Sequence, residues 1–543
     1  MIRRLPFHER EGSIMPSVDS FLNPRLKQVE SLYKASSEAY WQATTTGEEK
    51  YEQQYIGYRQ DLIRLFSNKE DYAILKEWLA NETLQKDLLL YRQLVLLEHE
   101  YIPNQPDADL LSDIVQKESE IEGEFTRFRV SLDGQTVSDN EIQDILQNET
   151  DSTIRRKAWE ASKQIGCQVA ERVIELVKLR NRAAQEAGFK NYYAMSLHLQ
   201  ELDGRDLFSI LAKLEKETTE PFRRAKRKLD GQLARTFKIS TNEVMPWHYA
   251  DPFFQEAPPP ENVQLDPYFK EKNIIEITKH FFADIGLDVE DILQRSDLFE
   301  RPNKNQHAYC IDIDHSGDVR VLANIRDNEW WMSTMLHELG HGVYDKYIDR
   351  TLPYLLRTPA HTLTTEAIAM FMGRLTKNPE WLTLYADVPK QEAERLGKEL
   401  EEYLSLSMLI FVRWGLVMVH FEHEMYHDPD QDLNALWWSL VERFQLIRKP
   451  DRRNEPDWAA KIHIGTAPVY YQNYILGELM ASQLHFMIVD ELRNDSYLKK
   501  KSTGAYLIRR IFHPGAQIPW YELLKNANGE GLNPDYFIKQ FIR

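Results

Sequence analysis

The sequence predicts a mostly α-helical protein with one small antiparallel β-sheet. Apolar residues recur at helical spacing through most of residues 16–235 and again from residue 330 to the end. Between these regions, residues 307–314 and 318–325 alternate between polar and apolar side chains. A His315-Ser-Gly turn separates the two runs, so we expect a β-hairpin there.

The composition describes a soluble globular protein with an acidic surface. Of the 543 residues, 42% are hydrophobic and 28% are charged, as in an ordinary water-soluble domain. There are 67 Lys and Arg against 85 Asp and Glu, which gives a formal charge of −18. This excess of negative charge disfavours nucleic acid and anionic membranes as partners. We expect a monomer or a homodimer.

The N-terminus and the cysteines bear on the compartment. Residues 1–14 have no apolar stretch of the kind found in a signal peptide, and we expect them to be disordered; Met15 is a second candidate start. The two cysteines, Cys167 and Cys310, make no disulfide framework, which is typical of a reducing compartment. We therefore expect a cytoplasmic protein. Because no long linker divides the chain, we expect one domain over residues 15–543.

The N-terminal half is predicted to be a series of helices. The helical spacing is clearest in Ala73–Leu90, Leu110–Phe128 and Arg155–Ala187. We place Arg180 and Asn181 on the surface of the last of these helices and assign them no chemistry.

The helical pattern is broken in the middle of the chain. Residues 245–254 and the Pro-rich residues 257–262 are predicted to be loops. Helix returns in Asn273–Ile285, the hairpin follows, and a further helix is expected over residues 328–346. The most apolar stretch, Leu404–Phe421, carries an Arg in its middle and is short for a membrane span, so we predict a buried helix.

The helix over residues 328–346 contains the sequence His-Glu-Leu-Gly-His, a match to the pattern H-E-x-x-H. Positions four apart lie on one face of a helix, so His337 and His341 can hold a single ion. Neutral imidazole is a good ligand for Zn²⁺, and Glu338 is placed to act as a base toward water. Gly340 weakens the helix by about 1 kcal/mol relative to Ala, which indicates close packing. The alternative is an ordinary helix with two core histidines.

A candidate third ligand decides between these explanations. Glu366 lies 25 residues after His341, in a predicted helix that starts near Thr358 and is ended by Gly373. A lone Glu on a helix is usually a surface residue. This one is followed by Ala, Ile, Ala, Met and Phe, where a free carboxylate is costly and a metal-bound one is not. We predict one Zn²⁺ held by His337, His341 and Glu366, with a fourth position left open.

A second group of polar residues lies nearer the C-terminus. Lys461 and His463 precede Tyr471 and Tyr474, which are three apart and share one face of a helix. Phenol donors suit an oxyanion or a carboxylate. Any one of these residues taken alone is most simply a packed or half-exposed side chain. That explanation weakens when they occur together. Separately, the edge of the predicted hairpin, which directly precedes the helix with the H-E-x-x-H residues, is suited to bind an extended peptide.

Together these residues resemble the angiotensin-converting-enzyme family of zinc peptidyl-dipeptidases and, more distantly, the thimet oligopeptidase and oligoendopeptidase F families. The likeness runs over most of the chain. It includes the metal motif, the downstream Glu, and six further pairs or runs: His307-Ala308, Trp437-Trp438, Lys461-x-His463, Tyr471-x-x-Tyr474, residues 519–524 and Tyr536-Phe537. The resemblance implies a helical ellipsoid with a deep central channel between two helical halves, with the hairpin lining the active site. Such a channel admits short, unfolded peptides.

The resemblance also implies roles. Three residues would be catalytic: Glu338, His463 and Tyr474, the last as donor to the oxyanion. Five would bind the peptide: His307, Ala308, Lys461, His463 and Tyr471. Within that set the two histidines would hold a backbone carbonyl, and Lys461 and Tyr471 would hold the C-terminal carboxylate.

The sequence departs from the family pattern in three respects. The family places a Gln among the carboxylate-binding groups, and residues 247–250 offer none. The Arg positions of the chloride-activated members are taken by Asn473 and Val441, so we do not expect chloride activation by the family's mechanism. The spacing from His341 to Glu366 is one residue longer and matches the oligopeptidases.

Three functions follow from these patterns. The leading prediction is a zinc peptidase that releases dipeptides from the C-termini of peptides. The alternative is an oligoendopeptidase that cuts short peptides internally, for which a fixed cation such as Lys461 is not required. The third is a helical binding protein without catalysis, which would need neither Glu338 nor Tyr474.

Overall fold

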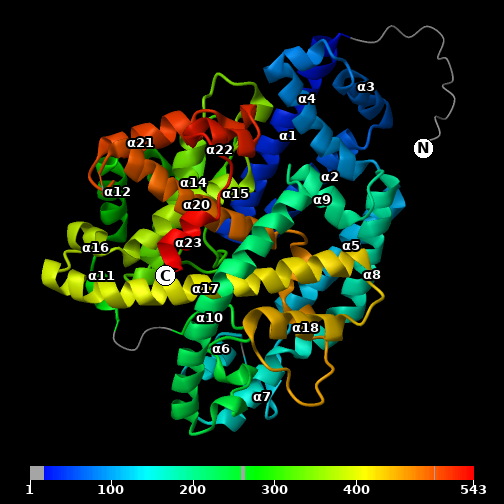
Figure 1. Cartoon of the computed structure of the whole chain (residues 1–543). Coiled ribbons are helices and arrows are strands. Elements are labelled where there is room, and N and C mark those ends of the chain that lie inside the picture. The colour runs from blue at the N-terminus through cyan, green and yellow to red at the C-terminus, as the bar shows by residue number, and fades with distance from the viewer. Residues whose placement is uncertain (1–16, 138, 259–262, 495, 543) are drawn as a thin grey trace.

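The computed structural model describes residues 17–137, 139–258, 263–494 and 496–542. This part of the chain is mostly α-helical and contains two small antiparallel hairpins, which confirms the predicted fold class (Figure 1). The predictions for residues 1–14 and Met15 lie outside the described residues.

The helices before the second hairpin form most of the N-terminal half. Their bounds are α1 Val18–Thr46, α2 Glu49–Phe66, α3 Lys69–Leu79, α4 Leu88–Tyr101, α5 Ala108–Arg127, α6 Asp139–Asn148, α7 Ser152–Ser162, α8 Gln164–Glu186, α9 Tyr192–Leu199, α10 Gly204–Phe237, α11 Asp266–Phe269, α12 Ile274–Asp284 and α13 Glu290–Arg295.

The second half of the chain is helical after the second hairpin, as predicted. Its bounds are α14 Glu329–Tyr347, α15 Thr362–Gly373, α16 Pro379–Tyr385, α17 Lys390–His427, α18 Leu433–Gln445, α19 Ile462–Thr466, α20 Tyr471–Leu492, α21 Lys501–Leu507, α22 Trp520–Asn528 and α23 Asp535–Phe541.

The sequence pattern predicted one of the two hairpins and not the other. The second consists of β3, Tyr309–Asp312, and β4, Val319–Leu322, with Cys310 opposite Val321, and confirms the predicted strand pair. The first consists of β1, Val130–Leu132, and β2, Gln135–Val137, within a region that we expected to be helical. An Asp-Gly turn between these strands, with both residues at positive φ, is the local signal that the helical interpretation passed over.

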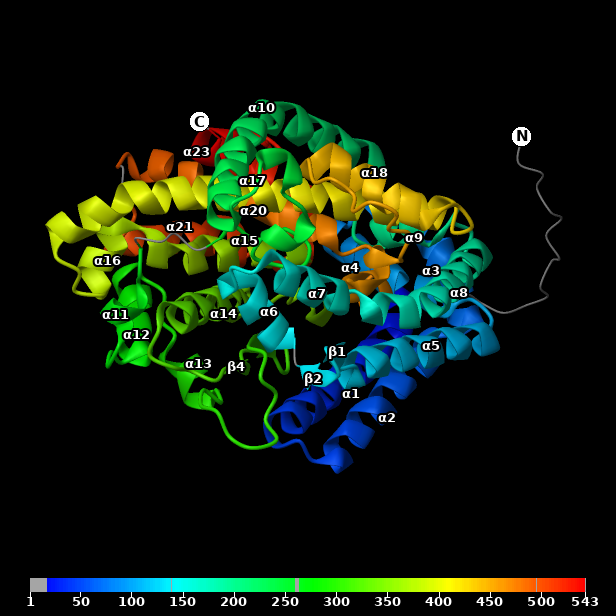
Figure 2. The same cartoon turned by 90° about the horizontal axis from the view of Figure 1, so that it is seen from below.

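Helix α17 runs across the molecule (Figures 1 and 2), and most of its buried residues lie between Leu409 and Tyr426. It is long and apolar enough to span a membrane, but 61% of its most apolar window is buried inside the protein. Arg413 in its middle is 3% exposed and donates to the backbone of Glu215 and to Thr219 in α10. These contacts are those of a core helix, as we predicted for Leu404–Phe421.

Three helices pack closely enough to hold one site. A methyl group on Gly340 of α14 would lie 2.8 Å from Ala369 Cα of α15, and one on Gly477 of α20 would lie 3.3 Å from Glu366 Cβ. A real Cβ atom is not found at the first of these distances. The close approach that Gly340 predicted is therefore present between α14 and α15, and Gly477 allows α20 to approach α15 from its own side.

Candidate metal centre and active site

The H-E-x-x-H residues and the distant Glu meet on these packed helices. The Nε2 atoms of His337 and His341 lie 3.9 Å and 4.0 Å from Glu366 Oε2, and all three candidate ligand atoms lie within 4.8 Å of one another. The side chains retain 32%, 18% and 14% exposure, so the group is reached from solvent.

The environment prepares these side chains for a cation. Burial lowers the pKa of His337 to about 4 and of His341 to about 3, which keeps both rings neutral and able to bind a metal. His341 Nδ1 lies 2.7 Å from Thr365 Oγ1, which fixes the ring. Glu366 is half-buried, with a pKa raised by desolvation, and the two imidazoles that lie 3.9 Å and 4.0 Å from its Oε2 are neutral and form no ion pair with it. Two neutral imidazoles and a carboxylate without a compensating cation fit zinc.

Glu338 points toward the hairpin. It is 8% exposed, and the backbone N–H of Cys310 in β3 donates to its carboxylate. Burial and the nearby charge of Glu366 raise its pKa to about 8. A buried carboxylate with a raised pKa beside a metal site has the properties of a general base.

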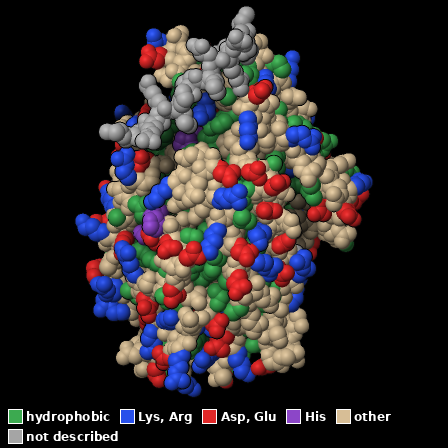
Figure 3. Space-filling view, turned by 90° about the vertical axis from the view of Figure 1, so that its right-hand side faces the viewer, with side chains coloured by type: hydrophobic (Ala, Val, Ile, Leu, Met, Phe, Trp, Pro, Cys, Tyr) green, Lys and Arg blue, Asp and Glu red, His purple; other side chains and the backbone are tan. Residues whose placement is uncertain are grey.

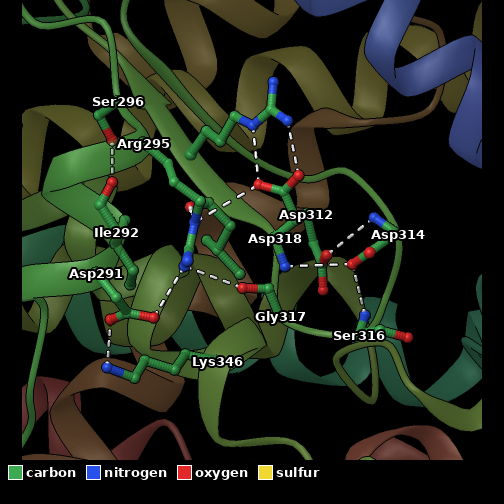
Figure 4. A network of polar contacts seen from close by, with 12 residues as sticks. Asp291, Ile292, Arg295, Ser296, Asp312, Asp314, Ser316, Gly317, Asp318 and Lys346 are labelled. Atoms are coloured by element: carbon green, nitrogen blue, oxygen red, sulfur yellow. Dashed lines mark hydrogen bonds and ion pairs between the residues drawn. The ribbon is translucent and has the colours of Figure 1, made fainter.

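The hairpin is held to the metal helix by a network of charged groups (Figure 4). Asp291 of α13 binds both Arg295, at 2.8 Å, and Lys346 near the end of α14, at 2.5 Å. Arg295 also donates to the carbonyl of Gly317 in the turn, at 3.0 Å. In β4 the N–H of Val321 donates to Ser296 Oγ at 2.8 Å. These bonds fix the turn and β4, and β4 pairs with β3, the strand that contacts Glu338.

The C-terminal group assembles around Lys461. Its Nζ donates to Gln255 Oε1 at 2.7 Å and lies 5.9 Å from the centre of the Tyr471 ring. Trp414 Nε1 donates to the Tyr471 hydroxyl at 2.7 Å. Burial lowers the pKa of Lys461 to about 8, against the opposing influence of nearby acidic groups.

His463 and the tyrosines connect this group to the metal ligands. The His463 ring lies 5.2 Å from the Tyr471 ring and 6.4 Å from the Tyr474 ring. Burial and then the Lys461 charge lower the pKa of His463 to about 4. Its Nδ1 is buried without a hydrogen-bond partner in the described part of the chain. Desolvation and the charge of Glu366 raise the pKa of Tyr474, which keeps its hydroxyl protonated.

Two predicted peptide-binding residues are not joined to this cluster. His307 is exposed, and its backbone N–H donates to Asn305 Oδ1 at 2.9 Å. Ala308 is partly buried against the core, one residue before β3. Both lie directly before β3, the strand that contacts Glu338, and no hydrogen bond or ring contact within the described residues joins either of them to His463.

Sequence reasoning missed three features of the site. Gln255, the amide that we did not find at residues 247–250, is the hydrogen-bond partner of Lys461, five residues further along the chain. Tyr470, which had no assigned role, donates to Glu366 Oε1 at 3.4 Å. Arg180 is not on the surface: it is 1% exposed and donates to Gly465 O in α19, the short helix that also carries His463.

The positions of the two absent arginines are occupied by buried side chains. Asn473 Nδ2 donates to Gln200 Oε1 at 2.9 Å, and Val441 lies with Lys163 and Trp438 around a cavity of about 20 Å³. Neither replacement supplies a guanidinium.

Comparison with family models decides the family. The model described as peptidase family M3 matches residues 145–542, well over half of the chain. The chain belongs to peptidase family M3. Every candidate metal, catalytic and peptide-binding residue lies within this match, and the angiotensin-converting-enzyme model matches residues 15–224. Both resemblances predicted from the sequence are confirmed, and family M3 consists of zinc metallopeptidases.

Individual relatives are distant. The angiotensin-converting enzyme of Mesocricetus auratus is 25% identical over 290 residues, which are 49% of this chain and 21% of that protein. The inactive angiotensin-converting enzyme-related protein of Caenorhabditis elegans is 22% identical over 72% of this chain and 48% of its own. Thermostable carboxypeptidase 1 of Pyrococcus furiosus is 26% identical over 31% of this chain and 33% of its own. The chain thus spans less than half the length of each of these relatives.

Proposed function

We propose that the chain is a zinc-dependent peptidase that releases dipeptides from the C-termini of short, unfolded peptides. The observation that carries this proposal is the cation of Lys461, held by Gln255 beside Tyr471. Ring contacts lead from Tyr471 to Tyr474 at 5.4 Å and on to Tyr470, whose hydroxyl reaches Glu366. A fixed cation near the ligands is suited to the carboxylate of a peptide end.

The residues of the site divide the chemistry between them. Zinc held by His337, His341 and Glu366 would polarise the scissile carbonyl and activate water. Glu338 would take a proton from the attacking water and return it to the leaving amine. Tyr474 would donate its hydroxyl proton as a hydrogen bond to the developing oxyanion.

Peptide binding is assigned to two sides of the site. His463 would grip the backbone carbonyl between the scissile bond and the C-terminus, together with His307 once the substrate joins the hairpin side. Ala308 would contribute backbone hydrogen bonds, as an exposed strand edge does for an extended peptide. Lys461 and Tyr471 would bind the terminal carboxylate, and the fixed distance to the metal would make the product a dipeptide.

Two further assignments belong to the proposal. We place the enzyme in the cytoplasm, because Cys167 and Cys310 are free thiols and a reducing compartment preserves them. Acidic and basic side chains are interspersed on the face seen in Figure 3. We propose short peptides as the partners and a chain that acts as a monomer or a homodimer.

The second candidate is an oligoendopeptidase that cuts internal bonds. It is favoured by the M3 match, which covers the whole site, and by the spacing from His341 to Glu366. An inactive binding protein is the third candidate, since one relative bears the word inactive in its name. The presence of Glu338 and Tyr474 beside the three ligands supports an enzyme instead.

Mass spectrometry of the products from one decapeptide and its C-terminally amidated twin separates the candidates. We expect the free peptide to lose two residues at a time from its C-terminus, and the amide to react about 10–100-fold more slowly, the kinetic equivalent of one charge-assisted bond. Equal cleavage of both peptides at internal bonds would establish the oligoendopeptidase instead. Failure of the zinc-loaded protein to cut either peptide would leave the binding protein.

A further inference from the structure

Val469, directly before Tyr470 and Tyr471, has an unfavourable backbone conformation. Its φ is +54°, in the left-handed region, and its side chain is 1% exposed. A β-branched residue in this region is a true outlier, with a cost on the order of 1–3 kcal/mol. Such a conformation persists only where the surroundings impose it.

Side chains from three elements impose it by binding both backbone groups of Val469. Its N–H donates to Glu422 Oε1 of α17 at 2.9 Å. Its carbonyl accepts from Gln472 Nε2 of α20 at 2.6 Å and from Gln200 Nε2, at the end of α9, at 3.0 Å. Rotation of the Val469 backbone would break all three bonds.

Gln200 extends these contacts to the helix of the third metal ligand. Its Oε1 accepts from Asn473 Nδ2 at 2.9 Å, and its backbone carbonyl lies 2.7 Å from His361 Nε2. His361 Nδ1 accepts from the N–H of Leu363, which caps α15 and places the proton on Nε2. One glutamine therefore ties the start of α20 to the start of α15, one turn before Glu366.

We propose that Gln200 and Glu422 are positioning residues, which hold the left-handed turn at Val469 and so fix the hydroxyls of Tyr470 and Tyr474 relative to Glu366. This inference rests on the proposed function to the extent that Tyr474 acts on a substrate.

Two observations favour a positioning role over simple packing. A buried carboxyl is costly, yet Glu422 is 1% exposed and accepts a hydrogen bond from the N–H of Val469. The bonds from Gln200 and Glu422 converge on the residue next to Tyr470, whose hydroxyl lies 3.4 Å from Glu366 Oε1. Displacement of a catalytic donor by about 1 Å costs on the order of 100-fold in rate.

The test compares Gln200→Leu and Glu422→Leu with the conservative Glu422→Gln. The amide oxygen of the last variant still accepts from Val469 N–H. Gln483→Leu is the matched control. Gln483 is a buried glutamine in α20, the helix that carries Tyr474, and like Gln200 it binds backbone groups: its Nε2 donates to Gly531 O at 3.0 Å, and its Oε1 accepts from Asn533 N at 2.9 Å. All four variants are assayed with zinc bound, on the free decapeptide.

We expect both Leu variants of the proposed positioning residues to lower kcat by about 10–100-fold with KM changed by less than about 3-fold. Glu422→Gln and Gln483→Leu should keep kcat within about 3-fold of the wild type. In a Tyr474→Phe background, Gln200→Leu should add little, because the donor that it positions is already gone. Wild-type kcat in a folded, zinc-loaded Gln200→Leu, or an equal loss in the Tyr474→Phe background, would overturn the inference.

Hydrogen exchange gives a readout that does not depend on catalysis. Exchange of the Val469 amide should rise in Glu422→Leu and stay slow in Glu422→Gln, whether or not the protein cuts peptides. Inactivity of the wild type with this exchange pattern would defeat the proposed function and leave the turn intact. Equal exchange in the two variants would contradict the role of Glu422 even in an active enzyme.

Discussion

At the scale of single residues, burial assigns each side chain of the site its protonation state. It lowers the pKa of His337 and His341 and raises that of Glu338 and Tyr474. Two neutral ligands and a protonated phenol are forms that metal-assisted peptide hydrolysis uses, and the folded chain alone provides them. Glu338, whose pKa is raised to about 8, must give up a proton before it can act as a base.

Glu338→Gln should keep zinc and lose nearly all turnover, because the amide cannot accept the proton of the attacking water. Tyr474→Phe, assayed beside it, should lower kcat by about 10²–10³, the cost of one oxyanion donor. Zinc content by elemental analysis and kcat on a short peptide are the measurements. Near-normal kcat in Glu338→Gln would rule out its role as base.

The pKa of Lys461 predicts a pH dependence of substrate preference. The amine is charged below about pH 8 and neutral above it, so its attraction for a carboxylate is present at low pH and disappears as the pH rises through about 8. The ratio of kcat/KM for the free and the amidated peptide should fall toward one above that pH. Lys461→Met should give a ratio near one at every pH. A ratio that is high in the variant would show that another group reads the terminus.

At the scale of elements, the site depends on the contact between α14 and α15. A methyl group on Gly340 would meet backbone atoms of α15, at 2.8 Å from Ala369 Cα and 3.2 Å from Ile368 O, and backbone cannot rotate away. The two histidines are on one helix of this pair and Glu366 is on the other. Any separation of the helices therefore moves one ligand away from the other two.

Gly340→Ala should destabilise the protein by about 1–3 kcal/mol through overpacking and weaken zinc binding by about 10–100-fold. Gly57→Ala is the control: Gly57 lies inside α2, has no atom within 4 Å of the added methyl, and should gain up to about 1 kcal/mol of helix stability. Urea unfolding and zinc titration against a chelator measure both effects. Tighter zinc binding in Gly340→Ala would refute the packing account.

Local patterns predicted those elements whose signal lies within a few residues. The metal helix and the β3–β4 hairpin follow from spacing and alternation in the sequence. The partnership of Lys461 with Gln255 spans 206 residues, and that of Gln200 with Val469 spans 269, and no periodicity carries such a contact. The burial of Arg180 could not be predicted from its own helix, because it depends on contacts with Gly465 and Tyr426, which lie far along the chain.

At the scale of the whole molecule, a buried acid makes stability depend on pH. Burial raises the pKa of Glu422 from 4.5 to about 8, against the N–H of Val469 and the charge of Arg180. The folded chain therefore holds this proton more tightly than the unfolded chain. The stability that the proton contributes is fully present below about pH 4.5 and is lost as the pH rises through about 8.

Glu422→Gln should remove this dependence, because the amide carries no titrating proton. Between pH 5 and pH 8 the stability of the variant should rise relative to the wild type by roughly 1–3 kcal/mol, within the limit of about 1.4 kcal/mol per pH unit for one group. Urea midpoints of both zinc-loaded proteins at the two pH values give the difference. Parallel profiles would show that Glu422 is already ionised in the folded protein.

The central claim is that three residues from two helices hold one zinc ion. Diffraction from zinc-soaked crystals, with anomalous data collected on both sides of the zinc edge, tests it most directly. We predict one strong peak per chain, about 2.0–2.2 Å from His337 Nε2, His341 Nε2 and a Glu366 oxygen. A peak elsewhere, or a Glu366 carboxylate turned to the surface and away from both imidazoles, would contradict the account.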